Sequence, residues 1–226
     1  MPTPHSSLRF AAAACLAGAA LLPAGCNIVG PAFFFIHGPE KVPAAFELPD
    51  DRTVVIFIDD RVPFTSRPVR ETIGRAAEQA LLDAGVVRDV VSSKAIQAVV
   101  ARERFGKPLG IADIGKAVGA DIVIYAWVDA FTLSVDTQTF SPAAALRVKV
   151  IDVASTERLF PAPDASEPWY PLAIQPAQQM GFRPSTPPEE DRARQDLANY
   201  VGLSLSRLFF EHERPKPQSR LDETDR

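Results

Sequence analysis

Residues 114–128 have the sequence Ile-Gly-Lys-Ala-Val-Gly-Ala-Asp-Ile-Val-Ile-Tyr-Ala-Trp-Val, and this stretch decides the fold class. Apolar residues recur at three- and four-residue spacing over 111–118, which predicts a short helix. Residues 122–128 are a continuous apolar and aromatic run, typical of a strand that is buried on both faces. Between them, Asp121 can accept hydrogen bonds from turn backbone where the strand starts. A helix that turns directly into a buried strand indicates helices packed against a sheet.

Similar patterns on both sides of this stretch predict the other elements. The expected strands are 53–58, 86–91, 122–128, 145–153 and 157–160, and the expected helices are 68–84, one capped by Ser92 or Ser93, 111–118, and a final one opened by Pro187-Pro188-Glu189-Glu190-Asp191. Strands that alternate with helices and end in a hairpin favour a mixed sheet. We therefore expect an α/β (α+β) fold: one domain, 51–212, with a sheet of about five strands packed against helices.

The amino-terminal residues 1–25 form a typical secretory signal. Arg9 precedes an apolar run from Phe10 to Leu22, followed by Pro23-Ala24-Gly25-Cys26. At about 1.5 Å per residue, this run is too short to cross a bilayer core of about 30 Å. Cys26 after small residues resembles the bacterial lipobox, whose cysteine is acylated, for example with palmitate, after cleavage. Pro23 stands where that motif usually has Leu, so a plain signal peptide with an incidental cysteine stays open.

Two segments flank the expected domain. Residues 26–50 contain several prolines and form a tether to the lipid on Cys26. The tether contains an apolar cluster, Phe33 to Ile36, which either lies among lipid headgroups or packs against the domain. Residues 213–226 are polar, and we expect a disordered tail there.

A third segment, the proline-rich stretch 161–188, interrupts the domain before the last helix. Its prolines argue against a helix or a central strand. It also carries Trp169, Tyr170 and Phe182, which we take as candidate residues for docking a partner. The alternative is that the segment wraps the sheet and buries these aromatics, and this alternative is favoured.

The elements over 53–160, rejoined by the last helix, resemble a group of bacterial envelope proteins. The sequence Val-Val-Ser-Ser-Lys at 90–94, residues 114–128, and Leu-Arg-Val-Lys-Val-Ile-Asp-Val-Ala-Ser-Thr-Glu-Arg-Leu at 146–159 carry the resemblance. The group contains the curli-secretion lipoprotein CsgG, the amino-terminal domain of TolB, and lipoprotein activators of penicillin-binding proteins. The resemblance implies a TolB-N/CsgG-like fold and an envelope location. Because the group includes channels, adaptors and activators, it implies no single activity.

Charge and residue chemistry exclude several function classes. The chain has a formal net charge of −4, whereas nucleic-acid binders are usually basic. His37 and His212 are not near a candidate nucleophile or second metal ligand in the sequence. Asp59 and Asp60 are adjacent at a strand end and so point to opposite faces. No glycine-rich phosphate loop is present. We expect no catalytic activity, no metal and no cofactor.

Two functions remain from the sequence. The first is a lipid-anchored adaptor or assembly factor that docks another envelope protein through a sheet edge or through 161–188. The alternative is a subunit of an oligomeric outer-membrane secretion channel of the curli-exporter type, with Phe131, Leu133 and Val135 as an apolar stripe on a hairpin. Self-association stays open in both. Asn27 follows the cysteine in place of the aspartate that retains many lipoproteins in the inner membrane. By family analogy, this indicates an outer-membrane location facing the periplasm.

Overall fold

The computed structural model describes residues 41–60, 64–102, 109–134, 139–176 and 183–214. Outside the described residues lie the signal peptide, Cys26, the apolar cluster at 33–36, Phe182 and the tail beyond 214. Of the described residues, 41–42 and 213–214 belong to one compact unit and 43–212 to another. Strands β1 (Lys41–Val42) and β8 (His212–Glu213) form a two-stranded sheet of their own.

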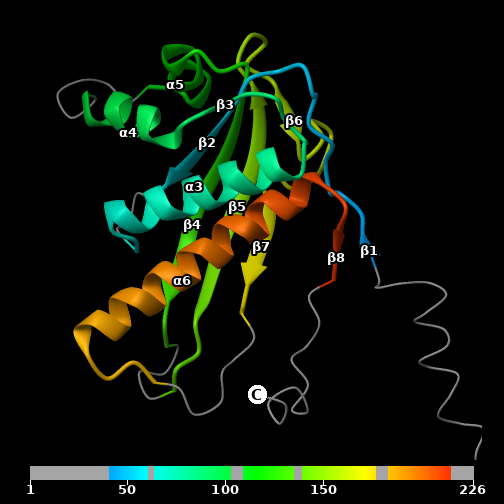
Figure 1. Cartoon of the computed structure of the whole chain (residues 1–226). Coiled ribbons are helices and arrows are strands. Elements are labelled where there is room, and N and C mark those ends of the chain that lie inside the picture. Colours follow the sequence, from blue (N-terminus) through cyan, green and yellow to red (C-terminus); the bar gives the residue numbers. More distant parts are fainter. Residues whose placement is uncertain (1–40, 61–63, 103–108, 135–138, 177–182, 215–226) are drawn as a thin grey trace, which may run out of the picture. The chain divides into compact units, whose positions relative to one another are not determined.

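The main unit is built on a six-stranded mixed sheet (Figure 1). Its strands are β2 (Val54–Asp59), β3 (Val90–Val91), β4 (Ile122–Thr132), β5 (Ala143–Asp152), β6 (Arg158–Phe160) and β7 (Tyr170–Ile174). Strand β2 pairs in parallel with β3 and β4, and β5 pairs antiparallel with β4, β6 and β7. The mixed sheet and the α/β class expected from the sequence are therefore confirmed.

Helices α3 (Arg67–Asp83) and α6 (Pro187–Ser206) lie side by side over one face of this sheet (Figure 1). Alternate residues of the strands meet them in the main core, whose fully buried members include Ile56, Ile73, Ile124, Leu146, Val201 and Leu205. The two helices approach each other closely at Gly202, where a Cβ atom would be 2.7 Å from the Cβ of Ala76. This contact requires a residue without a side chain on α6.

Helices α4 (Ser93–Arg102) and α5 (Ile111–Val118) pack against the other face, at the end where β4 begins (Figure 1). A second, smaller core lies beneath them, with Ile96 and Ile114 packed near Val55 and Val123. At Gly115 a Cβ atom would be 2.6 Å from Cγ2 of Val123, so glycine allows α5 to approach the sheet. Among the described residues, no helix covers the part of this face further along β4 and β5.

Two strands differ from the sequence expectation. The expected strand 86–91 shortens to Val90–Val91, and Val87 instead joins the main core. Strand β7 lies inside the proline-rich stretch, which we expected to be irregular, and it adds a sixth strand to the sheet. Its Pro171 is tolerated because β7 pairs only with β5 among the described strands, and an edge strand can spare a backbone donor.

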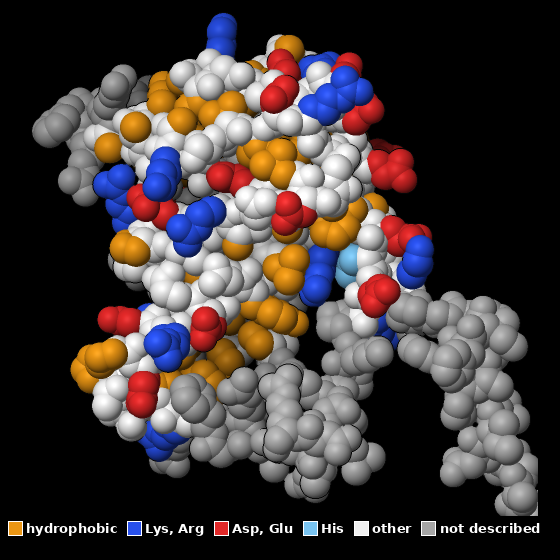
Figure 2. Space-filling model, in the orientation of Figure 1, with side chains coloured by type: hydrophobic (Ala, Val, Ile, Leu, Met, Phe, Trp, Pro, Cys, Tyr) orange, Lys and Arg blue, Asp and Glu red, His pale blue; other side chains and the backbone are white. Residues whose placement is uncertain are grey.

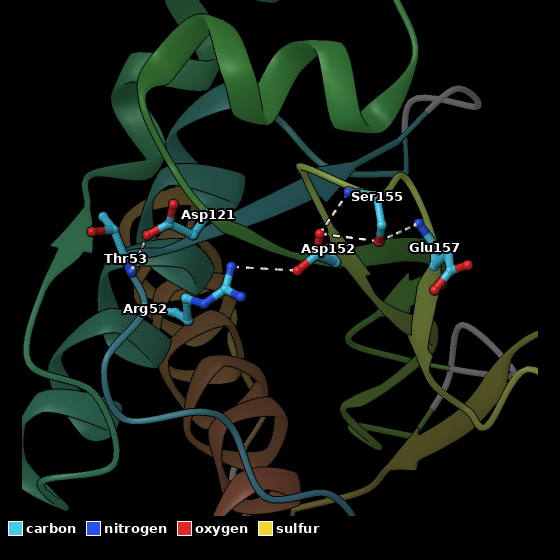
Figure 3. A network of polar contacts seen from close by, with 6 residues as sticks. All are labelled: Arg52, Thr53, Asp121, Asp152, Ser155 and Glu157. Atoms are coloured by element: carbon cyan, nitrogen blue, oxygen red, sulfur yellow. Dashed lines mark hydrogen bonds and ion pairs between the residues drawn. The ribbon is translucent and has the colours of Figure 1, made fainter.

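Polar side chains tie the turns together at the end of the sheet where β4 begins (Figure 3). Asp121 accepts a hydrogen bond of 2.9 Å from the backbone N–H of Thr53, before β2, rather than from its own turn as expected. Asp152 accepts one of 2.8 Å from the N–H of Ser155, and its other oxygen lies 3.5 Å from the guanidinium of Arg52. Asp121 therefore helps to fix where β2 begins, and Asp152 helps to fix where β5 ends.

Basic and acidic side chains alternate over the face of the molecule that shows α3 and α6 (Figure 2). No large patch of one sign is visible in this view. In the described part of the chain, no helix is both long and apolar enough to cross a bilayer.

Candidate functional site

The part of the second sheet face that no described helix covers, called the uncovered face below, carries two rows of side chains that run across the strands. Because side chains alternate along a strand, residues paired across strands share a face. The first row contains Phe57, Tyr125 and Lys149, and the second contains Asp59, Trp127, Arg147 and Pro171. Phe57 and Tyr125 are buried in the smaller core, and Trp127 and Trp169 pack against it partly buried. Trp169 directly precedes β7, next to the first row. We call Tyr125, Trp127, Arg147, Lys149 and Trp169 the aromatic–cation cluster.

Trp169 is the centre of this cluster. The ammonium nitrogen of Lys149 lies 4.1 Å from the centroid of its ring, and the guanidinium carbon of Arg147 lies 5.2 Å from it. The rings of Tyr125 and Trp127 are 5.7 Å and 6.5 Å away, centroid to centroid. These are distances at which cation–π and tilted aromatic contacts are favourable. Trp169 therefore holds the start of β7 against the side chains of β4 and β5.

Arg147 already has a carboxylate partner. A register shift between Val128 and Ala130 lets Asp129 reach it, and the guanidinium donates two hydrogen bonds of 2.7 Å and 2.8 Å to the two carboxylate oxygens. The hydrogen bond to Asp129 is the main cause of a raised Arg147 pKa. Such a bidentate pair fixes the guanidinium plane. Arg147 is thus oriented, and its charge is largely balanced.

Lys149 has no such carboxylate partner among the residues that the structure describes. Its ammonium lies over the rings of Trp169 and, at 5.3 Å, Tyr125, and no carboxylate of the described residues lies within ion-pair distance of it. Burial lowers the pKa of Lys149, and the positive charge of Arg158 lowers it further. Both effects disfavour the charged ammonium. An anion beside Lys149 would offset the repulsion from Arg158 and favour the charged ammonium.

The two aspartates at the end of β2 point apart, as the sequence predicts. Asp59 accepts a hydrogen bond of 2.6 Å from the hydroxyl of Tyr125 on the uncovered face. Asp60 accepts from the backbone and hydroxyl of Thr65 and lies 3.7 Å from the guanidinium of Arg70. The two carboxylates therefore have separate hydrogen-bond partners.

Within the described residues no group of three or more metal-ligating side chains comes together. His212 contacts the carbonyl oxygen and the ring of Phe210.

The structure separates the residues expected to dock a partner. Trp169 lies in the cluster, but Tyr170 lies on the opposite face of β7, where its ring is 5.1 Å from that of Phe160 in the main core. Phe182 is outside the described residues. The sequence did hold a signal for the members that were missed. Arg147 and Lys149 alternate with buried residues along β5, so they share a face. The two-residue spacing of Tyr125 and Trp127 along β4 likewise puts these two side chains on one face.

The chain matches no protein-family model and no curated protein. Among solved structures, it is similar to the PelC dodecamer from Paraburkholderia phytofirmans (14% identity, 74% of this chain and 95% of that chain, TM-score 0.36). It is also similar to lipoprotein GNA1162 from Neisseria meningitidis (10%, 62% and 91%, TM-score 0.39). A third is the LpoB C-terminal domain from Salmonella enterica (17%, 57% and 86%, TM-score 0.35). Of these three neighbours, GNA1162 is named as a lipoprotein. Likenesses this distant leave the function to be argued from the chain's own residues.

Proposed function

We propose that this chain is a non-catalytic, lipid-anchored protein of the bacterial envelope that acts as an adaptor. It docks a partner protein on the uncovered sheet face, with the aromatic–cation cluster at the centre of the contact. The anchor is a lipid on Cys26, and the domain faces the periplasm from the outer membrane. The observation that carries the docking role is the stack of Trp127, Arg147, Trp169 and Lys149 on a face that no described helix covers.

The residue types in this stack support protein binding. Trp, Tyr and Arg are enriched among the residues that dominate binding energy at protein interfaces. Their rings and stems are held in place by one another, so they lose little side-chain entropy when a partner binds. The cluster is therefore preorganised for a contact with another protein.

The charge of the face indicates the chemistry of the partner. Asp129 is paired with Arg147, and Asp59 accepts from Tyr125, so neither neutralises Lys149. Asp59 keeps its negative charge, but among the described residues no carboxylate lies within ion-pair distance of Lys149, so the positive charge at Lys149 is unpaired. The complementary partner is thus a protein that presents acidic side chains.

Photo-crosslinking in cells tests the docking role. A photoreactive amino acid at Ala173, which is exposed and pairs with Ala145 on the same face, should give a discrete adduct with another protein. The same amino acid at Ala84, exposed at the end of α3, is the control position. The adduct should disappear with Lys149→Glu and persist with Lys116→Glu, which reverses an exposed charge on α5.

Three results would contradict the proposal. The first is no adduct at Ala173, the second is the same adduct at Ala84, and the third is an adduct indifferent to Lys149→Glu. An adduct with a second copy of the chain would instead assign the face to self-association. Labelling with radioactive palmitate tests the anchor: the wild type should be labelled and the Cys26→Ser variant should not.

The hairpin formed by β4 and β5 gives no support to the alternative of a channel subunit. Phe131 and Leu133 lie against the main core and line a cavity of about 450 Å³ near the start of α3. Both apolar side chains are therefore half-buried against the domain's own core. Val135 lies outside the described residues.

A further inference from the structure

Arg158 of β6 is a second cation near the aromatic–cation cluster. Like Lys149, it has no carboxylate partner among the described residues. It pairs with Ile151, which lies two residues beyond Lys149 on the same side of β5. Its terminal nitrogen donates to the carbonyl oxygens of Ala162 and Pro163 at 2.9 Å and 3.0 Å. No carboxylate of the described residues lies within ion-pair distance of its guanidinium.

One donor of Arg158 is also left unused. Its Nε atom is buried and has no hydrogen-bond acceptor in the described part of the chain. Buried donors without acceptors are rare in folded proteins because the lost hydration is not replaced. The guanidinium is therefore held by neutral carbonyls on one side and lacks an acceptor on another.

Arg158 pairs with Ile151, two residues from Lys149 on the same side of β5, and its positive charge helps to lower the pKa of Lys149. Nearby like charges are unfavourable, and burial makes them more so. The third cation of the face, Arg147, does not share this deficit because Asp129 neutralises it. The uncompensated positive charge is thus confined to the side of Trp169 where Lys149 and Arg158 lie.

We propose that Lys149 and Arg158 form a seat for a carboxylate, beside the ring of Trp169, and that an acidic side chain of the docked partner fills it. This inference rests on the proposed function and names the partner group that the face recognises. A carboxylate would accept from the Lys149 ammonium, neutralise the guanidinium, and remove the repulsion between the two cations. Trp169 would flank the seat and exclude water from it.

A peptide-binding measurement tests the seat. The full chain, purified in detergent, is titrated into a dye-labelled, end-blocked tetraglutamate peptide, and anisotropy gives the affinity. The chain contains only two tryptophans, Trp127 and Trp169, so a change of intrinsic emission on binding reports on the cluster. The matched peptide is tetraglutamine, and inorganic phosphate at equal ionic strength is the competing small anion.

We expect tetraglutamate to bind and tetraglutamine not to bind. Combining Lys149→Met with Arg158→Met should weaken binding at least about tenfold, because the charge-assisted hydrogen bond from Lys149 alone contributes about that much. The matched control combines Arg88→Met with Lys116→Met, which remove two exposed cations elsewhere, and should bind as the wild type does. Lys149→Arg keeps the charge and should retain most of the affinity, which separates charge from folding.

Equal binding by the two double variants would overturn the seat, and so would the absence of any tetraglutamate binding. Displacement of the peptide by phosphate at equal concentration would assign the seat to a free phosphate group instead. The two proposals can fail separately. If crosslinking at Ala173 succeeds and the peptide does not bind, the docking face stands and the seat is wrong. If the peptide binds and no crosslink forms at Ala173, the chain has a site for a carboxylate and the docking of a partner protein on this face is wrong.

Discussion

The ammonium nitrogen of Lys149 lies 4.1 Å from the centroid of the Trp169 indole, and this contact joins β5 to the segment that leads into β7. Trp169→Ala should lower the free energy of unfolding by about 2 kcal/mol, less than the loss for a fully buried tryptophan, because the ring is half-buried. Trp169→Phe keeps a ring over the lysine and should lose less. Denaturant unfolding measures both. Equal stability of Trp169→Ala and wild type would contradict the anchoring role.

The pKa of Lys149 should depend on Arg158. Burial is the main cause of the lowered Lys149 pKa, and the positive charge of Arg158 lowers this pKa further. Arg147 also lies on this face, where it is paired with Asp129. Arg158→Met should therefore raise the pKa of Lys149 toward its usual value of 10.5. An NMR titration that follows the Cε resonance of Lys149 measures this pKa. An unchanged pKa in the variant would mean that the two cations do not interact.

That lowered pKa also has a consequence for stability. At pH values below the folded-state pKa, Lys149 is charged in both the folded and the unfolded protein, and the buried charge destabilises the folded protein. Between the folded pKa and the higher unfolded pKa, the unfolded state binds more protons, so stability increases with pH there. Relative to Lys149→Met, the wild type should gain stability as the pH rises toward 10.5. A constant difference between the two proteins across the alkaline range would contradict this assignment.

Asp152 stabilises the turn between β5 and β6 through its carboxylate. Asp152→Ala removes the hydrogen bonds from Ser155 and the contact with Arg52, and should cost about 1–2 kcal/mol at neutral pH. The hydrogen bond from the Ser155 backbone is the main cause of a lowered Asp152 pKa. The stabilisation is therefore complete above the ordinary value of 3.8 and is lost as the pH falls through the lower folded pKa.

Urea unfolding at several pH values checks this prediction. The difference between wild type and Asp152→Ala should narrow only below pH 3.8. Asp89→Ala, at an exposed position before β3, is the control and should change stability by less than about 0.5 kcal/mol. A difference that persists unchanged in acid would show that the carboxylate charge is not involved.

Gly202 should not tolerate a side chain. A Cβ atom there would meet the carbonyl oxygen of Ile73 and lie 3.0 Å from the backbone nitrogen of Ala77. Backbone cannot rotate away, so α3 and α6 must separate. We expect Gly202→Ala to destabilise the protein by about 1–3 kcal/mol, despite the better helix propensity of alanine. Asn199→Ala, on the exposed side of α6, should be neutral or slightly stabilising. Thermal unfolding compares them, and a stabilised Gly202→Ala protein would contradict the packing of α3 on α6.

The elements with strong periodicity could be predicted from the sequence. The continuous apolar runs placed β2 and β4, and the three- and four-residue spacing placed α3, α5 and α6, because burial alone determines such patterns. Strand β7 could not be predicted, since its prolines argue against a strand and only pairing along β5 compensates for them.

The site was predicted only at Trp169. Tyr170 is its neighbour in the sequence, and both are aromatic, but alternation along β7 sends their side chains to opposite faces. The partners of Trp169 come from β4 and β5, and the register that brings Tyr125 and Lys149 opposite each other is a property of the folded sheet. Arg158 depends in the same way on the pairing of β6 with β5.

The most direct test of a partner on the uncovered sheet face is the protection of a single cysteine in cells. Cys15 leaves with the expected signal peptide and Cys26 would carry the lipid, so Ala173→Cys would supply the one reactive thiol. In the purified protein it should react with a maleimide as fast as Ala84→Cys. In cells with a permeabilised outer membrane, labelling should be slowed at position 173 only, and Lys149→Glu should restore it. Equal labelling at the two positions in cells would contradict a docked partner on this face.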